Sequence, residues 1–111
     1  MEYRLVYITV SSADEARKVG KEIVSQRLAA CVNILGPIQS MYWWKGNLQE
    51  DNEMVVIAKT TAALVPRLIE RVKAVHSYEV PCIVALPLTE GNPDFLNWIA
   101  QETESPSVSS G

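Results

Sequence analysis

The sequence is poor in residues on which many enzymes and membrane proteins depend. Its 111 residues include one histidine, two cysteines and five glycines. A lone histidine limits acid–base chemistry, and neither a phosphate-binding glycine loop nor a GxSxG elbow nor paired catalytic carboxylates can be located. The longest apolar runs, such as residues 83–86, fall far short of the roughly 18–20 residues that cross a bilayer. These absences argue against nucleotide-binding, hydrolytic and membrane-spanning functions.

Positive charge is scarce as well. Ten Lys and Arg stand against thirteen Asp and Glu, so the net charge is −3, and no basic cluster is present to neutralise nucleic-acid phosphates. The hydrophobic and charged fractions, 48% and 21%, are typical of soluble domains, and the length fits one domain. The first residues lack a signal-peptide pattern. One cytoplasmic domain, with neither nucleic-acid nor membrane partners, is therefore expected.

The two cysteines do not form a recognisable redox or zinc motif. Cys31 and Cys82 lie far apart in the sequence, without the close spacing of a CxxC pair. Both have apolar neighbours, so we expect buried, reduced thiols rather than a disulfide.

Hydrophobic patterning predicts four strands and three helices. Ser12 followed by Glu15 has the pattern of a helix-capping box, and Gly36-Pro37 interrupts an apolar run, which predicts a bend or bulge. The expected strands are residues 3–10, 30–35 continuing through 38–44, 48–60 and 82–86, with a turn at 45–47. The expected helices are residues 13–27, a segment from a Thr60 or Thr61 cap to His76 with Pro66 in its first turn, and a last helix opened by Asn92-Pro93.

This order of elements predicts a ferredoxin-like α+β fold. In such a βαββαβ arrangement four antiparallel strands form one sheet, and right-handed crossovers place both long helices on one face. The domain is expected to span residues 1–103 and to include the extra C-terminal helix. The Ser- and Pro-rich tail, residues 104–111, is expected to be disordered.

The bare sheet face and the long hairpin predict self-association. Exposed Val, Ile, Tyr and Trp side chains would form a larger apolar patch than monomers usually carry. The hairpin of residues 30–60 outreaches its neighbouring strands, so its distal half needs a partner, which a second copy supplies. In the alternative, the hairpin tip is an ordered loop and the tail covers the sheet. Tyr42 and Trp44 are expected to pack between subunits rather than to form a ligand cage.

Three segments resemble one known family. They are residues 27–33, RLAACVN; residues 40–46, SMYWWKG; and residues 76–81, HSYEVP. Together they resemble CutA, the divalent-cation tolerance proteins. The resemblance implies a compact homotrimer similar in assembly to the PII signalling proteins, and a link to copper and other divalent metals. Ser77 stands where the family usually has proline, and its presence is expected to loosen the chain beside His76.

Three side chains could form a metal site at a subunit boundary. Cys31 offers a thiolate suited to Cu(I), His76 an imidazole suited to copper or zinc, and Glu79 a carboxylate. Simpler roles remain open: a core thiol for Cys31, a cation at a helix C-terminus for His76 and a solvated charge for Glu79. The expected ligand is copper or another divalent metal, with no organic cofactor.

Two more residues are expected at the cleft between subunits. Tyr78 lies between His76 and Glu79 in a connecting segment, where binding groups tend to sit on a rigid scaffold. Lys59 ends an apolar strand and is expected to pair with Glu53 or Glu79, or to bind an anion in the cleft.

These features favour a non-enzymatic homotrimer that binds divalent metals and takes part in the response to metal ions. The alternative is a PII-like signalling or scaffold trimer whose clefts, around Lys59, His76 and Glu79, bind a small metabolite or a protein partner. A hydrolase is the weakest hypothesis, because Cys31 with His76 is its only candidate nucleophile–base pair.

Overall fold

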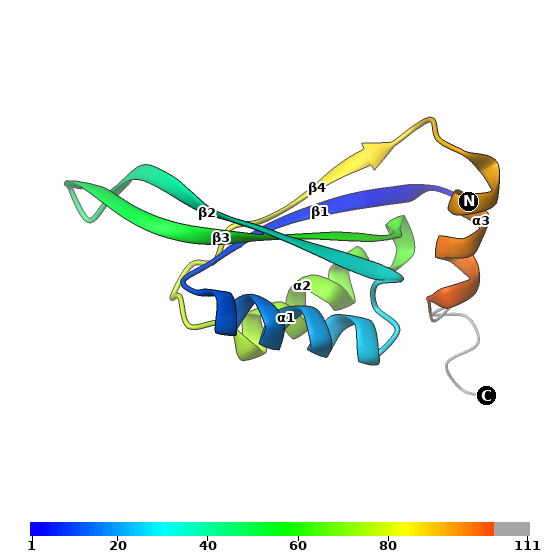
Figure 1. Cartoon of the computed structure of the whole chain (residues 1–111), viewed down its shortest axis with the longest axis horizontal. Helices are drawn as coiled ribbons and strands as arrows, with labels where there is room; N and C mark the ends of the chain where they lie inside the picture. Colours follow the sequence, from blue (N-terminus) through cyan, green and yellow to red (C-terminus); the bar gives the residue numbers. More distant parts are fainter. Residues whose placement is uncertain (104–111) are drawn as a thin grey trace.

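The chain forms one four-stranded sheet with helices packed against it (Figure 1). The computed structural model describes residues 1–103, so the tail predicted to be disordered lies outside the described residues. The strands are antiparallel in the order β2-β3-β1-β4, which confirms the predicted ferredoxin-like α+β fold. The elements are β1 (Tyr3–Val10), α1 (Ala13–Ser25), β2 (Cys31–Trp44), β3 (Asn47–Thr61), a 3-10 turn (Ala62–Leu64), α2 (Val65–Val75), β4 (Ile83–Leu88) and α3 (Pro93–Glu102).

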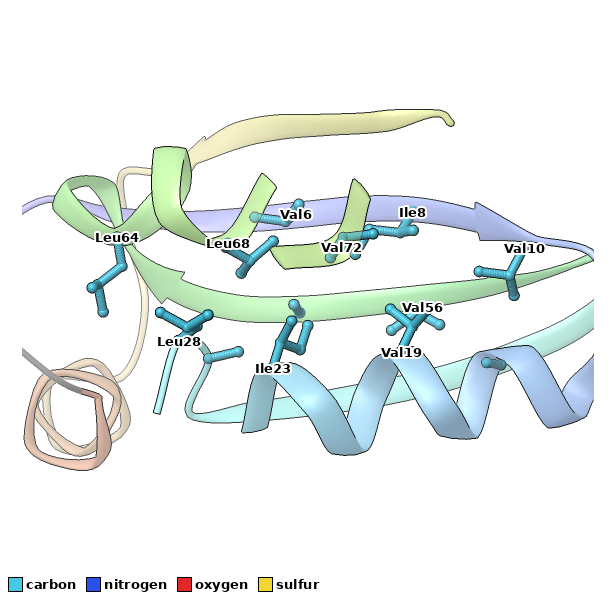
Figure 2. Packing of buried hydrophobic residues seen from close by; sticks show 13 residues of the cluster. Val6, Ile8, Val10, Val19, Ile23, Leu28, Val56, Leu64, Leu68 and Val72 are labelled. Atoms are coloured by element: carbon cyan, nitrogen blue, oxygen red, sulfur yellow. The ribbon is translucent and has the colours of Figure 1, made fainter. Parts of the chain in front are cut away.

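The core lies between the sheet and helices α1 and α2, which run along the same face (Figure 1). β1 contributes Val6, Ile8 and Val10, which alternate along the strand and therefore share one side. The facing helix residues recur every three or four positions, as one helical stripe requires. They are Val19 and Ile23 of α1 and Leu68 and Val72 of α2 (Figure 2). Each is fully buried, which stabilises the fold by roughly 1.5–3 kcal/mol per side chain.

The start and end of α1 differ in detail from the prediction. Ser12 Oγ accepts a hydrogen bond from the Glu15 amide at 3.1 Å, as the capping box requires. The Glu15 carboxylate, however, reaches back to Ser11 rather than to Ser12, accepting from its amide at 2.8 Å and its hydroxyl at 2.9 Å. The helix ends at Ser25, before the predicted Arg27, because Arg27 adopts a left-handed φ of 61°.

Neither Thr60 nor Thr61 caps α2, contrary to the prediction. β3 continues through Thr61, which pairs with Tyr3 of β1, and the 3-10 turn intervenes before α2 begins. The buried Thr60 hydroxyl instead donates to the Leu28 carbonyl at 2.7 Å. The predicted position of Pro66 in the first turn of α2 is confirmed.

The β2–β3 hairpin projects well beyond the helices (Figure 1). β1 pairs with β3 only along residues 54–61, so residues 38–53 form a two-stranded ribbon, here called the arm. The pairing register shifts between Leu35 and Ile38, at the predicted interruption, where the Gly36-Pro37 peptide bond is cis. Within residues 1–103 the arm therefore has no third strand beside it.

At the arm tip, Lys45 and Gly46 have φ values of 49° and 82°, the positive angles that tight hairpin turns require.

Large apolar side chains are exposed on the arm and elsewhere on the surface. No helix of residues 1–103 crosses the face of the sheet opposite α1 and α2 (Figure 1), and none is long and apolar enough to cross a membrane. Exposed apolar residues include Met41, Tyr42, Trp43, Trp44 and Leu48 on the arm, Ile34, Leu35, Val84 and Leu86 on β2 and β4, and Phe95 and Trp98 on α3.

Both cysteines are free thiols that lie outside the core. Cys31, at the start of β2, is partly exposed, and Cys82, just before β4, is exposed. The expectation of buried thiols is therefore wrong for Cys82 and met only in part for Cys31. Cys82 is two positions before Val84, which is exposed like Leu86, so it falls on the exposed side of this segment.

Candidate functional site

A pocket of about 750 Å³ lies where the arm meets the loop between α2 and β4, residues 76–82. Aromatic and other apolar side chains make up most of its lining, and the charged lining residues are carboxylates. The residues that define its chemistry are Tyr42, Trp43, Trp44, Tyr78, Glu53 and Glu79. The interface residues Tyr42, Trp44 and Tyr78 predicted from sequence thus share one pocket with the predicted ligand Glu79.

Glu53 and Tyr78 link the two sides of this pocket. Glu53 lies on β3 at the base of the arm and is only 7% exposed. The Tyr78 hydroxyl donates to Glu53 Oε2 at 2.7 Å. Burial, reinforced by this hydrogen bond and by the Glu53 charge, raises the pKa of Tyr78, so its phenol stays a protonated donor. On the arm, Tyr42 donates to Asp51 Oδ2 at 2.5 Å, and this hydrogen bond raises the pKa of Tyr42.

His76 is a buried anchor for the loop. Its side chain is completely shielded, and the Tyr78 amide donates to its Nδ1 at 3.0 Å. Because an amide can only donate, Nδ1 must accept, so Nε2 carries the proton and donates to the Thr9 carbonyl at 2.8 Å. The ring is therefore neutral, with both nitrogens engaged, and the helix-end cation considered for it is not formed. His76 fastens the loop to the end of β1 and positions Tyr78, whose ring lies 4.7 Å away.

Ser77 is held by Glu15 rather than loosened. The Ser77 amide donates to Glu15 Oε2 at 2.8 Å, a bond that proline, the usual residue of the resembled family, could not make. Burial alone would raise the pKa of Glu15, but hydrogen bonds from Ser11 and Ser77 outweigh it and lower the pKa to about 2. The expected loosening at Ser77 is therefore wrong, because the hydrogen bond from its amide to Glu15 restrains the chain at this position.

Cys31 lies far along the sheet from His76. It pairs in register with Lys59 of β3, which pairs with Leu5 of β1, whereas His76 contacts β1 at Thr9. The strand interval from Leu5 to Thr9 alone spans roughly 13 Å. Cys31 and His76 are thus no nucleophile–base pair within one chain, and no group of three His, Cys, Asp or Glu in residues 1–103 could hold a metal ion. A metal site that these side chains form between copies stays a prediction.

Lys59 does not pair with a carboxylate of the described chain. Its ammonium donates to Asn33 Oδ1 on the neighbouring strand. Glu53 lies on the same strand as Lys59, at a distance of roughly 20 Å for six residues of extended chain, which is beyond the reach of a side chain. The predicted pairing is therefore not formed with Glu53 within one chain, and Glu79 approaches Lys45 instead. Lys59 is not part of the pocket lining, and its place in a cleft between copies stays a prediction.

Glu79 forms the rim of the pocket. Its carboxylate lies 4.0 Å from Lys45 Nζ at the arm tip, and both side chains are 72% exposed. The same ammonium lies 5.5 Å from the centre of the Trp44 ring. The loop and the arm tip therefore approach one another through an exposed ion pair, which contributes little to stability because water screens it.

Sequence patterning alone misses the roles of two pocket residues. It treats Glu53 only as a partner for Lys59, and Cys82 as a core residue, whereas both line the pocket. A signal for Glu53 does exist, since it lies two positions before the buried Val55 and so shares one face of β3 with it. No sequence signal points to Tyr78 as its partner.

Comparisons with known proteins agree with this architecture. Residues 4–102 match the family model described as CutA1 divalent ion tolerance protein. The divalent-cation tolerance protein CutA of Thermus thermophilus is 50% identical over 99 residues, which cover 89% of this chain and 96% of that protein. Protein CutA of Mus musculus is 45% identical over 93% of this chain, and this chain spans 58% of the mouse protein.

Solved structures show the same fold. That of the Thermus thermophilus divalent cation tolerance protein has a TM-score of 0.90 and 48% identity, covering 92% of this chain and 99% of the other. The Archaeoglobus fulgidus CutA structure has a TM-score of 0.89 and 40% identity, with coverages of 92% and 99%, and that protein is described as periplasmic. The cytoplasmic location expected for the present chain stays a prediction. From the family model, the identities and the shared fold, the chain belongs to the CutA1 divalent ion tolerance protein family.

Proposed function

We propose that this chain is a non-enzymatic divalent-cation tolerance protein that works as a homotrimer. Family membership supports the tolerance role. The arm supports the proposed assembly, because large apolar side chains, among them Tyr42 and Trp44, are exposed on this two-stranded ribbon, which has no third strand within residues 1–103. Association of copies through the arm would bury these side chains and pair the free strand edges.

The proposed metal is copper or another divalent ion, bound where copies meet. Cys31 would supply a thiolate, Glu79 a carboxylate and His76 an imidazole. Cys31 and Glu79 both have accessible side chains. His76 would have to exchange one of its two internal hydrogen bonds for a bond to the metal, so its participation carries an energetic cost that the other two ligands do not share.

The non-enzymatic part of the proposal is supported by how the candidate reactive groups are used. Both nitrogens of His76 make hydrogen bonds, and Cys31 lies too far away for His76 to activate it. The phenols of Tyr42 and Tyr78 have raised pKa values, which keeps them protonated and poor as bases or nucleophiles.

Light scattering after size-exclusion chromatography tests the assembly. We expect a mass three times the 12.3 kDa of the chain. Trp44→Ala should shift the population toward smaller species at low concentration. Trp98→Ala is a matched control, because the two indoles are exposed to a similar extent, 38% and 37%, but Trp98 lies on α3. A monomer from the unaltered chain would contradict the proposal.

Calorimetric titration of Cu(I), Cu(II) and Zn(II) into the reduced protein tests the metal role. Stoichiometric binding is expected, and Cys31→Ser and Glu79→Gln should each weaken it. Cys82→Ser is the matched control, because it also replaces one thiol but leaves the proposed ligands intact. The metal affinity of this variant should match that of the unaltered chain. Binding that survives in all variants, Cys31→Ser included, would overturn the ligand assignment.

A PII-like role in binding a small molecule is the second candidate, and the pocket of about 750 Å³ favours it. Its size is in the range of about 300–1,000 Å³ that small-molecule sites usually have, and its lining is mostly apolar with a few polar groups, as in such sites. Thermal-shift screening separates the candidates: stabilisation by metals favours the first, and stabilisation by an organic molecule alone favours the second.

A further inference from the structure

Association of copies through the arm covers the pocket between the arm and the loop. Three of the aromatic side chains that line this pocket, those of Tyr42, Trp43 and Trp44, lie on the arm. A neighbouring copy that buries the arm therefore also covers Glu53, which lines the same pocket. The group that Glu53 meets in the assembly is then a side chain of another copy.

Glu53 is a buried carboxylate that is only partly paired in its own chain. It is 7% exposed, and the neutral hydroxyl of Tyr78 donates to its Oε2. Within residues 1–103, Oε1 accepts no hydrogen bond, and no Lys or Arg forms an ion pair with Glu53. A carboxylate removed from water with one neutral donor keeps part of its desolvation cost, which an incoming cation offsets.

Lys59 carries the opposite charge on the same face of the sheet. Val6 and Ile8 of β1 face the helices, so Leu5 and its register partner Lys59 face away from them. Glu53 lies six positions from Lys59 on β3 and therefore faces the same way. No helix of residues 1–103 crosses this side, here called the open face (Figure 1).

Lys59 is also the sheet cation that lacks a carboxylate partner within residues 1–103. The Lys and Arg residues of the strands and of the arm turn are Arg4, Lys45 and Lys59. Arg4 pairs with Glu2 at 3.3 Å, and Lys45 lies 4.0 Å from Glu79. The Lys59 ammonium instead donates to the neutral amide oxygen of Asn33. The open face thus presents one incompletely paired charge of each sign.

We propose that Lys59 of one copy forms an ion pair with Glu53 of the neighbouring copy. Within one chain the two groups stay apart, because roughly 20 Å of extended strand separates them. In a ring of three, each copy gives its ammonium to one neighbour and receives the ammonium of the other neighbour, as head-to-tail contacts require. This inference rests on the proposed homotrimer and names two residues through which its copies recognise one another.

Charge complementarity favours a second copy as the partner of the open face, and Glu53 as the partner of Lys59. One copy presents both halves of the pair at separate places on this face, so identical copies satisfy each other's charges. Glu79 is less suitable, because it is exposed and already lies beside Lys45. An exposed pair is screened by water, whereas a buried, hydrogen-bonded pair fixes how two surfaces align.

Charge reversal tests the pairing. Glu53→Lys and Lys59→Glu each bring two like charges together, so each should weaken association by about tenfold or more, measured by light scattering over a dilution series. The double variant exchanges the two charges and should recover the mass of the unaltered assembly. Lys18→Glu and Glu70→Lys are matched controls on the exposed surfaces of α1 and α2, and both should assemble normally.

Neutral variants keep the test decisive where a reversal disturbs folding, which thermal unfolding detects. Glu53→Gln, Lys59→Met and their combination remove one charge or both with little change in side-chain size. Each single change should weaken association. The combination should weaken it by less than the product of the two single factors, because the first change already breaks the pair. Two factors that simply multiply would overturn the proposal.

The outcomes distinguish a failure of this pairing from a failure of the proposed trimer. A monomer from the unaltered chain would contradict both. A trimer that both single reversals leave intact would contradict the ion pair alone. Rescue of Lys59→Glu by Glu79→Lys, but not by Glu53→Lys, would show that Glu53 is the wrong partner.

Discussion

The backbone amide of Ser77 donates to Glu15 Oε2 across 2.8 Å and so fastens the loop after α2 to the first turn of α1. The other oxygen of the same carboxylate accepts from the amide and the hydroxyl of Ser11. One ionised side chain thus holds together the end of β1, the start of α1 and the loop that carries Tyr78.

Glu15→Gln should destabilise the protein in a pH-dependent way. The pKa of Glu15 is about 2 in the folded chain against an ordinary value of 4.5, so ionised Glu15 stabilises the fold above about pH 4.5. That contribution is lost as the pH falls toward 2. We expect the substitution to lower the free energy of unfolding by about 1–3 kcal/mol at pH 7, and by less at pH 3, as measured by urea denaturation.

Asp14→Asn is the control for the Glu15 experiment. Asp14 lies in the same first turn but is 91% exposed, so the substitution should cost less than about 1 kcal/mol at both pH values. A loss for Glu15→Gln that does not vary with pH would show that the carboxylate charge is not the cause.

Ser77→Pro should raise the pKa of Glu15. The substitution removes both the hydroxyl and the amide hydrogen of Ser77, each of which lowers the pKa of this carboxylate. Ser77→Ala retains this amide and loses only the hydroxyl, so the pKa should rise less. Carboxyl-carbon NMR titration of both variants measures the two shifts, and an equal rise in both would argue against the role of the amide.

The His76 ring should carry its proton on Nε2. Nitrogen NMR of the ring distinguishes this tautomer from the one protonated on Nδ1, which the hydrogen bond from the Tyr78 amide excludes. His76→Ala should lower the free energy of unfolding by about 2–4 kcal/mol, because it empties a buried position and leaves the Thr9 carbonyl without its donor. An Nδ1-protonated ring would contradict the anchoring role.

Thr60→Val should lower the free energy of unfolding by about 1–2 kcal/mol, because the buried Leu28 carbonyl loses the hydroxyl that donates to it. Thr61→Val is the matched control: the same change in shape at a neighbouring position where the hydroxyl makes no capping bond. Its effect should stay within about 0.5 kcal/mol. Urea denaturation of the two variants provides the comparison, and equal losses would refute the assigned role of Thr60.

The fold is largely predictable from local patterns. Alternation along β1, the Ser12 cap, the turn chemistry of Lys45-Gly46 and the Asn92 cap each act within a few residues, and the structure confirms all of them. The threonine cap fails for a non-local reason: pairing with β1 extends β3 through Thr61, and this tertiary contact overrides the capping preference.

The candidate site is less predictable, because its contacts join segments that lie far apart in the chain. Patterning identifies Tyr42, Trp44, Tyr78 and Glu79, which the fold brings to one pocket. It does not reveal that the Tyr78 hydroxyl hydrogen-bonds to Glu53. Nor does it reveal that both ring nitrogens of His76 make hydrogen bonds, to the Thr9 carbonyl and the Tyr78 amide. Those pairings depend on the path of the loop after α2, which no short-range signal describes.

The division of β3 into two parts has a consequence for amide hydrogen exchange. Residues 54–61 lie in the interior of a four-stranded sheet, whereas residues 47–53 belong to a two-stranded ribbon, and such ribbons are only marginally stable in water by themselves. Amide protons of residues 38–53 should therefore exchange quickly in a single copy and become protected when copies associate. Deuterium uptake in the arm should therefore fall as the protein concentration rises, because more copies are then associated. Uptake in β1 should depend on unfolding alone.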